Sequence, residues 1–162
     1  KPEDDDTLTP AESRAPSLRT RSTDVEHLSH SHHPTSKIGI LLVDDHAMVR
    51  QGLRSVLEHY DDVAVVGEAS TGREAIEFVE RLRPAVIVMD INMPETNGID
   101  ATVEIKARHP DVAVIGLSVH NTAEARKAML QAGATTLLSK ESAVDELYAA
   151  IRQALADEGV PR

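Results

Sequence analysis

Short apolar runs alternate with amphipathic segments from Lys37 to the end of the chain. Each run is rich in Val, Ile or Leu, the composition of a strand. A run that is apolar throughout, rather than at every second position, indicates a strand covered on both faces, as in parallel sheets. The predicted strands are 38–43, 63–69, 85–90, 112–118 and 136–139.

The segments between these runs repeat apolar residues at helical spacing. The pattern is clear in the first, second and last segments, weaker in the third, and replaced by an alanine-rich stretch at 122–132. The apolar positions are Val49, Leu53, Val56 and Leu57; Ala75, Ile76, Val79 and Leu82; Ile99 and Val103; and Val144, Leu147, Tyr148, Ile151 and Leu155.

Capping residues support the same helices. A Ser, Thr or Asn three residues before an acid predicts a helix start, and a glycine after the last turn predicts a helix end, as Gly133 does for the fourth helix. The predicted starts are Thr71 before Glu74, Asn121 before Glu124, and Ser142 before Asp145.

Strict alternation of strand and helix predicts an α/β fold, a doubly wound five-stranded parallel sheet with five helices. The simplest strand order is 2-1-3-4-5, in which the first and third strands are neighbours at the switch point where such sheets bind ligands. Asp44 and Asp45 follow the first strand and Asp90 ends the third. We therefore expect three carboxylates at one rim of the sheet.

Carboxylates gathered in this way repel one another unless a cation compensates them. Mg²⁺ suits the predicted site because it binds carboxylate oxygens, keeps part of its water and leaves positions for phosphate oxygens. Lys140 ends the fifth strand and Ser118 the fourth, which adds an ammonium and a hydroxyl at the same rim. An aspartate so placed can attack a phosphoryl group and hold it as an acyl phosphate. Asp90 is the candidate nucleophile.

Composition excludes several other classes. The 162 residues are 41% hydrophobic, enough for one domain with a core. There is no cysteine, no signal peptide pattern and no run of about 18 apolar residues, so we expect a cytoplasmic chain without membrane contact. The net charge of -10 and 2% aromatic content disfavour direct nucleic acid binding by this chain.

The chain divides into unlike regions. Residues 1–36 hold four of the eight prolines and no glycine, which predicts a disordered polar tail or linker. The folded domain is predicted at 37–156, with a C-terminal tail at 157–162. The first region contains a histidine cluster that either ligates zinc or nickel weakly or is incidental to a linker. Its members are His27, His30, His32 and His33.

Four sequence motifs together resemble the receiver domain of two-component response regulators. They are VDDH at 43–46, MDINMPETNGID at 89–100, GLSV at 116–119, and the AGA and LLSKE segments within 132–141. The resemblance extends over residues 37–155 with the motifs in the family's order. The opening DDHAMVRQGL is most similar to receivers that precede a LuxR-type helix-turn-helix.

The resemblance implies a flavodoxin-like receiver fold and a set of residue roles. By resemblance, Asp90 is both the phosphoacceptor and a metal ligand, Asp45 binds Mg²⁺ directly, and Asp44 is an outer or water-bridged partner of the metal. Asn92 lends its backbone carbonyl to the metal, and Ser118 and Lys140 contact the phosphoryl group.

The resemblance also implies partners. A histidine kinase or a histidine phosphotransfer domain would donate the phosphoryl group, and the face between Asn121 and Tyr148 would bind a partner or form a homodimer. The chain itself would not be an enzyme beyond slow self-phosphorylation and self-dephosphorylation. Because a long tail precedes the domain, we expect the C-terminal receiver of a hybrid sensor kinase, with a transcription-factor receiver as the alternative.

Two positions depart from the family pattern. Leu137 stands where many members carry the Tyr or Phe that rotates on activation, and Glu141 follows the lysine where Pro is common. An aspartate-nucleophile phosphohydrolase is a different class to consider, but it needs a second acid where this chain has Asn92. A flavin or nucleotide binder would need a glycine-rich loop after the first strand, where Asp44 and Asp45 would instead repel a pyrophosphate.

Overall fold

The computed structural model describes residues 36–159. The predicted tail, apart from Ser36, lies outside the described residues, together with its histidine cluster and residues 160–162.

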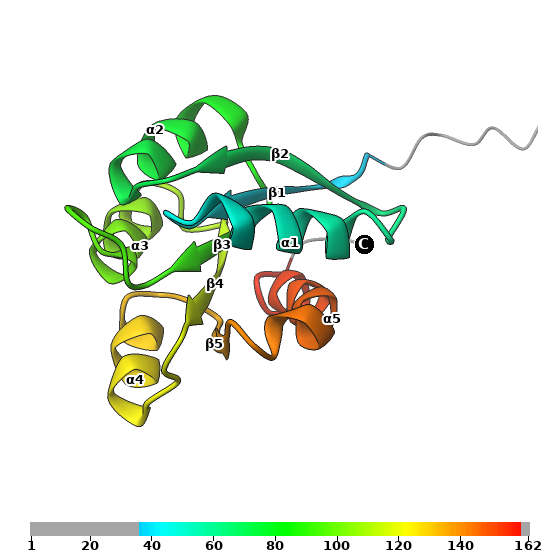
Figure 1. Cartoon of the computed structure of the whole chain (residues 1–162). Helices are drawn as coiled ribbons and strands as arrows, with labels where there is room; N and C mark the ends of the chain where they lie inside the picture. Colours follow the sequence, from blue (N-terminus) through cyan, green and yellow to red (C-terminus); the bar gives the residue numbers. More distant parts are fainter. Residues whose placement is uncertain (1–35, 160–162) are drawn as a thin grey trace, which may run out of the picture. The chain divides into compact units, whose positions relative to one another are not determined.

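A parallel five-stranded sheet in the order β2-β1-β3-β4-β5 forms the centre of the described chain (Figure 1). The predicted fold class and strand order are confirmed, and the predicted strands differ from the observed ones by at most one residue at an end. The strands are β1 (Ile38–Val43), β2 (Val63–Ala69), β3 (Val86–Asp90), β4 (Ala113–Ser118) and β5 (Thr136–Ser139).

Helices cover both faces of the sheet (Figure 1). Two of them, α1 and α5, pack on one face, and the other three pack on the opposite face. The helices are α1 (Ala47–Leu57), α2 (Gly72–Leu82), α3 (Gly98–Arg108), α4 (Ala123–Gln131) and α5 (Ala143–Asp157).

Successive side chains of β1 point to opposite faces of the sheet, so this strand contributes to the hydrophobic core on each face. Ile40 and Leu42 pack with α1 and α5, whereas Leu41 and Val43 pack with α2 and α3. All four side chains are essentially inaccessible to solvent. Burying both faces is what makes the run continuously apolar, and each such side chain contributes about 1.5–3 kcal/mol to folding.

Several predicted details of the helices are corrected by the structure. Thr71 caps α2 as expected, but Thr122, not Asn121, caps α4 and accepts from the N–H of Ala125. Ser142 begins α5 without a side-chain capping bond, because its hydroxyl is bonded to Ser139. Gly133 follows α4 with a φ of 109°, a conformation that favours glycine.

Two predicted apolar positions face solvent. Val103 of α3 is 52% exposed and Val144 of α5 is 57% exposed. In α3 the buried face is formed by Ala101, Thr102 and Ile105 instead. The hydroxyl of Thr102 donates to the Gly98 carbonyl, so its burial leaves no donor unsatisfied.

None of the described helices is both long and apolar enough to cross a membrane.

Candidate functional site

The register of β1 and β3 brings two acids side by side. Val43 is aligned with Met89, so the residues that follow them, Asp44 and Asp90, lie at the same level at the rim of the sheet. Both are fully buried, at 1% and 0% exposure. Asp45 is the next residue of the same turn and is partly exposed. The predicted gathering of three carboxylates at the carboxyl rim is therefore observed.

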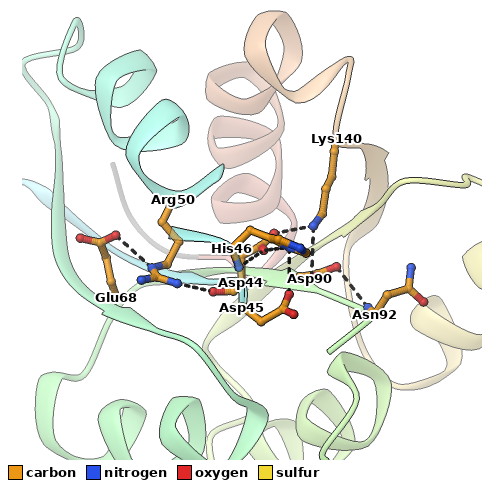
Figure 2. A network of polar contacts seen from close by, with 8 residues as sticks. All are labelled: Asp44, Asp45, His46, Arg50, Glu68, Asp90, Asn92 and Lys140. Carbon is orange, nitrogen blue, oxygen red and sulfur yellow. Dashed lines mark hydrogen bonds and ion pairs between the residues drawn. The ribbon is translucent and has the colours of Figure 1, made fainter. Parts of the chain in front are cut away.

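The acids form one tight cluster (Figure 2). One ligand atom from each of Asp44, Asp45, His46 and Asp90 lies within 4.8 Å of every other. The buried Oδ1 of Asp45 has Nδ1 of His46, at 3.1 Å, as its close partner and is otherwise without a hydrogen-bond donor among the described residues. A buried carboxylate oxygen with so few partners is costly, and a cation would remove this cost.

Lys140 supplies the counter-charge from the end of β5 (Figure 2). Its Nζ lies 2.6 Å from Oδ2 of Asp44 and 3.2 Å from Oδ2 of Asp90. Its backbone N–H donates to the carbonyl of Ser118, which fixes the lysine to the end of β4. One ammonium is therefore shared between two buried carboxylates.

Burial and charge shift the protonation equilibria at this rim. Loss of solvation raises the pKa of Asp90 above its usual value, and the charge of Asp44 adds to this, while the N–H of Asn92 and the ammonium of Lys140 offset it in part. Burial by itself would lower the pKa of Lys140, but its contacts with Asp44 and Asp90 prevail and raise it. Lys140 thus stays charged at neutral pH.

The turn after β3 contacts the Asp90 carboxylate through a backbone hydrogen bond. The N–H of Asn92 donates to Oδ1 of Asp90 over 3.1 Å, and the Asn92 side chain points away from the acids (Figure 2). Gly98, at the start of α3, donates its N–H to the Ile91 carbonyl, and a Cβ at Gly98 would overlap the Asp90 carbonyl. Glycine at position 98 is therefore what allows α3 to begin against the end of β3.

Ser118 lies at the rim but is engaged elsewhere. Its hydroxyl donates to the His120 carbonyl over 2.8 Å and accepts from the His120 N–H over 3.1 Å. Contact with a phosphoryl group on Asp90 would require the hydroxyl to leave these two bonds. The structure therefore places the predicted serine beside the site with its hydroxyl bonded to the β4–α4 turn.

Two contributors were not assigned a site role from the sequence. His46 lies over the acids, with Nδ1 at 3.2 Å from Oδ1 of Asp44 and 3.1 Å from Oδ1 of Asp45. Arg50 donates to the Asp44 carbonyl over 2.6 Å and is itself held by Glu68. The position of His46 directly after the two acids could have indicated its place at the site from the sequence. The Arg50 contact could not be predicted in this way, because it depends on how α1 packs against β2.

The donor set fits Mg²⁺. Asp44, Asp45 and Asp90 offer carboxylate oxygens, the ligands that this hard cation prefers, and the open side at Asp45 leaves room for water. The three acids outnumber the one lysine at the cluster, so a divalent ion would bring the local charge close to neutral.

A doubly wound sheet with acids and a lysine at its switch point is the architecture of receiver-type signalling domains. The chain belongs to this family, because residues 40–152 match the model of the response regulator receiver domain.

Named relatives agree with this membership. The chain is 39% identical over 117 residues to the transcriptional regulatory protein DegU of Brevibacillus brevis, covering 72% of this chain and 50% of that protein. It is 42% identical over 115 residues to the response regulator UvrY of Escherichia coli (strain K12), covering 71% of this chain and 53% of that protein. The chain spans about half the length of these relatives.

Solved structures show the same fold. The response regulator domain of Thermotoga maritima CheB superposes with a TM-score of 0.69 at 34% identity, covering 74% of this chain and 97% of that chain. The signal receiver domain of a putative NarL response regulator from Mycobacterium tuberculosis gives a TM-score of 0.68 at 27% identity, covering 78% and 99% respectively.

Proposed function

We propose that this chain is a phosphorylation-dependent switch of a two-component system, with Asp90 as its phosphoacceptor. The observation that carries the proposal is a fully buried aspartate whose carboxylate lies beside a second acid and within 3.2 Å of a lysine ammonium. A histidine kinase or a histidine phosphotransfer domain is the proposed donor.

The chemistry follows from the position of Asp90. A carboxylate oxygen of Asp90 attacks the phosphorus of a phosphohistidine, the bond between phosphorus and imidazole nitrogen breaks, and the imidazole leaves with the electron pair. Asp44, Asp45 and the backbone carbonyl of Asn92 are the proposed holders of Mg²⁺. When bound, Mg²⁺ supplies positive charge that neutralises the phosphoryl oxygens during transfer.

Lys140 and Ser118 are the proposed sensors of the new group. Lys140 is shared between Asp44 and Asp90 before transfer, and a phosphoryl dianion on Asp90 attracts it more strongly than a carboxylate does. Ser118 would exchange its bonds to His120 for a bond to the phosphoryl group. Both movements pull on the turn that leads into α4.

The helix after that turn is weakly anchored. Met129 is the only buried residue of α4, and its side chain packs near Leu137 beneath Gly116. Because Leu137 is fully buried and not aromatic, the response would pass through the packing of Met129 and Leu137. We place the responsive partner or homodimer surface on the exposed side chains between Asn121 and Tyr148.

The domain would act by changing partners, with no turnover of its own beyond slow loss or gain of the phosphoryl group. The relatives named above are a transcriptional regulatory protein and a response regulator, which favours the transcription-factor origin over the hybrid kinase. Under this proposal the domain spanning 37–156 is the regulatory part of a longer protein.

Labelling with a small acyl phosphate tests the central assignment. With Mg²⁺ present, the chain should gain one acid-stable, base-labile phosphoryl group, and Asp90→Asn should incorporate none because an amide cannot form the acyl phosphate. The matched control is Asp111→Asn, which removes an exposed carboxylate before β4, at the opposite end of the strands. Undiminished labelling of Asp90→Asn would refute the proposal.

A further inference from the structure

We propose that His46 is a nitrogen ligand that lets this acidic site bind transition-metal dications in competition with Mg²⁺. The inference rests on the proposed function, because it concerns the same metal site. It adds one residue to that site and a second class of cation that the site accepts.

The spacing of the donor atoms carries the inference. Nδ1 of His46 lies 3.1 Å from Oδ1 of Asp45 and 3.2 Å from Oδ1 of Asp44 (Figure 2). A dication with ligands at about 2.0–2.2 Å places neighbouring ligands roughly 3 Å apart in octahedral geometry. The nitrogen is thus already at the separation of two ligands on one ion from each of these oxygens, and all the donor atoms of the cluster lie within 4.8 Å of one another.

The two cationic partners of the acids use different oxygens. Lys140 contacts Oδ2 of Asp44 and Oδ2 of Asp90, whereas His46 contacts Oδ1 of Asp44 and Oδ1 of Asp45. The Oδ1 atom of Asp45 is buried, and apart from the His46 imidazole no donor of the described residues contacts it. A metal between the imidazole and the Oδ1 atoms therefore does not have to displace the ammonium.

The local backbone keeps the His46 ring over the acids. His46 is the N-cap residue of α1, yet its side chain makes no bond to the helix. Its backbone N–H donates instead to Oδ1 of Asp44 over 2.8 Å, which closes the turn and directs the ring toward the carboxylates. The side chain is 66% exposed, so an ion and its water can reach Nδ1 from solvent.

The donor chemistry determines which ions respond to His46. Imidazole suits Fe²⁺, Ni²⁺ and Zn²⁺, whereas Mg²⁺ prefers oxygen and gives up its water reluctantly. A neutral ring with its proton on Nε2 leaves the Nδ1 lone pair for the metal. His46 should therefore strengthen binding of transition metals and leave the affinity for Mg²⁺ nearly unchanged.

The experiment is calorimetric titration of the full chain with Ni²⁺ and, separately, with Mg²⁺. All variants are made in a background in which His27, His30, His32 and His33 are replaced by Asn, so that the tail does not bind the Ni²⁺. The test variant is His46→Ala. The matched histidine control is His120→Ala, on an exposed residue of the β4–α4 turn.

We expect His46→Ala to weaken Ni²⁺ binding by at least about tenfold, the lower end of what loss of a partner around a metal costs. The Mg²⁺ affinity should change by less than about threefold, because water replaces the imidazole. His120→Ala should leave both affinities unchanged. With Co²⁺ as a spectroscopic probe, the visible absorption bands should shift in His46→Ala only, and circular dichroism should show an unchanged fold.

Asp45→Asn separates this inference from the proposed function. It should abolish binding of both Ni²⁺ and Mg²⁺. If the parent binds no Mg²⁺, or Asp45→Asn retains it, the acidic metal site and the proposed function fail together. If Asp45→Asn abolishes Mg²⁺ binding but His46→Ala leaves Ni²⁺ binding intact, or weakens both ions equally, the role of His46 alone is overturned.

Discussion

Asp90 combines two properties that both disfavour its charged form, since it is fully buried and it lies beside another carboxylate. Its pKa is raised chiefly because burial removes water from the charged form. An aspartate that binds its proton more tightly in the folded state than in the unfolded state lowers stability as pH rises. The burial of Asp90 therefore costs stability at neutral pH.

Replacing Asp90 with Asn should accordingly stabilise the metal-free domain at neutral pH. We expect a gain of roughly 1–3 kcal/mol, the scale on which a poorly solvated buried polar group is penalised. The gain in the free energy of unfolding should reach its maximum above the raised pKa of Asp90. It should vanish as pH falls below the ordinary aspartate pKa of about 3.9, where the carboxyl is neutral in both states.

Urea denaturation at a series of pH values, without metal, measures this difference. Adding Mg²⁺ should stabilise the parent chain but not the variant, so the gap between them should narrow. A variant that is less stable than the parent at neutral pH would show that Lys140 compensates Asp90 fully and that the raised pKa has no energetic consequence.

The site residues differ in how far the sequence could place them. Asp44, Asp90 and Lys140 were predictable because each ends or follows an apolar run, and parallel strands bring such ends to one rim. The direction of the Ser118 hydroxyl was not predictable, since it depends on the turn at His120. The same holds for the His46 ring, which the Asp44–His46 turn orients.

At the scale of elements, α1 is connected to the site by an ion-pair network on β2. Glu68 accepts from Arg50 over 3.2 Å and from Arg54 over 2.7 Å, and its pKa is lowered mainly by the bond from Arg54. Arg50 extends beyond Glu68 to the carbonyl of Asp44 (Figure 2). The network therefore positions the backbone that carries the first two acids.

Arg50→Met should weaken Mg²⁺ binding by about tenfold, comparable to the loss of an outer partner around a metal. Removing the guanidinium frees the Asp44 carbonyl, so the Asp44–Asp45 turn is less well fixed. Arg54→Met is the control, because it loses the shorter bond to Glu68 but has no contact with Asp44. Calorimetric titration with Mg²⁺ compares the two, and equal affinities would exclude a positioning role for Arg50.

This network also marks the limit of prediction from sequence. The strands followed from their apolar runs to within one residue, because a buried strand has no polar side. The start of α4 was misplaced by one residue because Asn121 and Thr122 are adjacent and both can cap a helix. The Arg50–Glu68 pair joins residues that are 18 positions apart in the sequence. The place of Glu68 along the sheet depends on a register shift between β1 and β2, which no local sequence pattern predicts.

Across the whole described domain, the two ends of the strands serve different purposes. The carboxyl ends carry the acids, whose burial costs stability, while contacts at the amino ends tie helices together. The rings of Tyr60 and Tyr148 stack with their centroids 3.7 Å apart, and the Tyr148 hydroxyl donates to Oδ2 of Asp62. These contacts join α5 to the segment between α1 and β2, away from the acidic rim.

Lys106 makes three polar contacts at the amino ends of the strands. Its Nζ donates to the carbonyls of Pro110 and Val112 and to Oε1 of Glu158, over 2.6, 3.0 and 3.0 Å. It joins the end of α3, the start of β4 and the residue that follows α5, and its side chain is only 16% exposed. Removing the ammonium leaves two carbonyls and a carboxylate without this donor.

Lys106→Met, which keeps most of the apolar stem, should therefore destabilise the domain by roughly 1–3 kcal/mol while leaving Mg²⁺ affinity and phosphoryl labelling unchanged. Arg108→Met is the control on the same helix, because its ion pairs with Glu80 and Glu104 are about half exposed and such pairs contribute less than about 1 kcal/mol. Urea denaturation and Mg²⁺ titration of both variants test the separation. Since the acidic rim is built from the other ends of the strands, a fall in Mg²⁺ affinity in Lys106→Met under native conditions would mean that the two ends are coupled through the sheet.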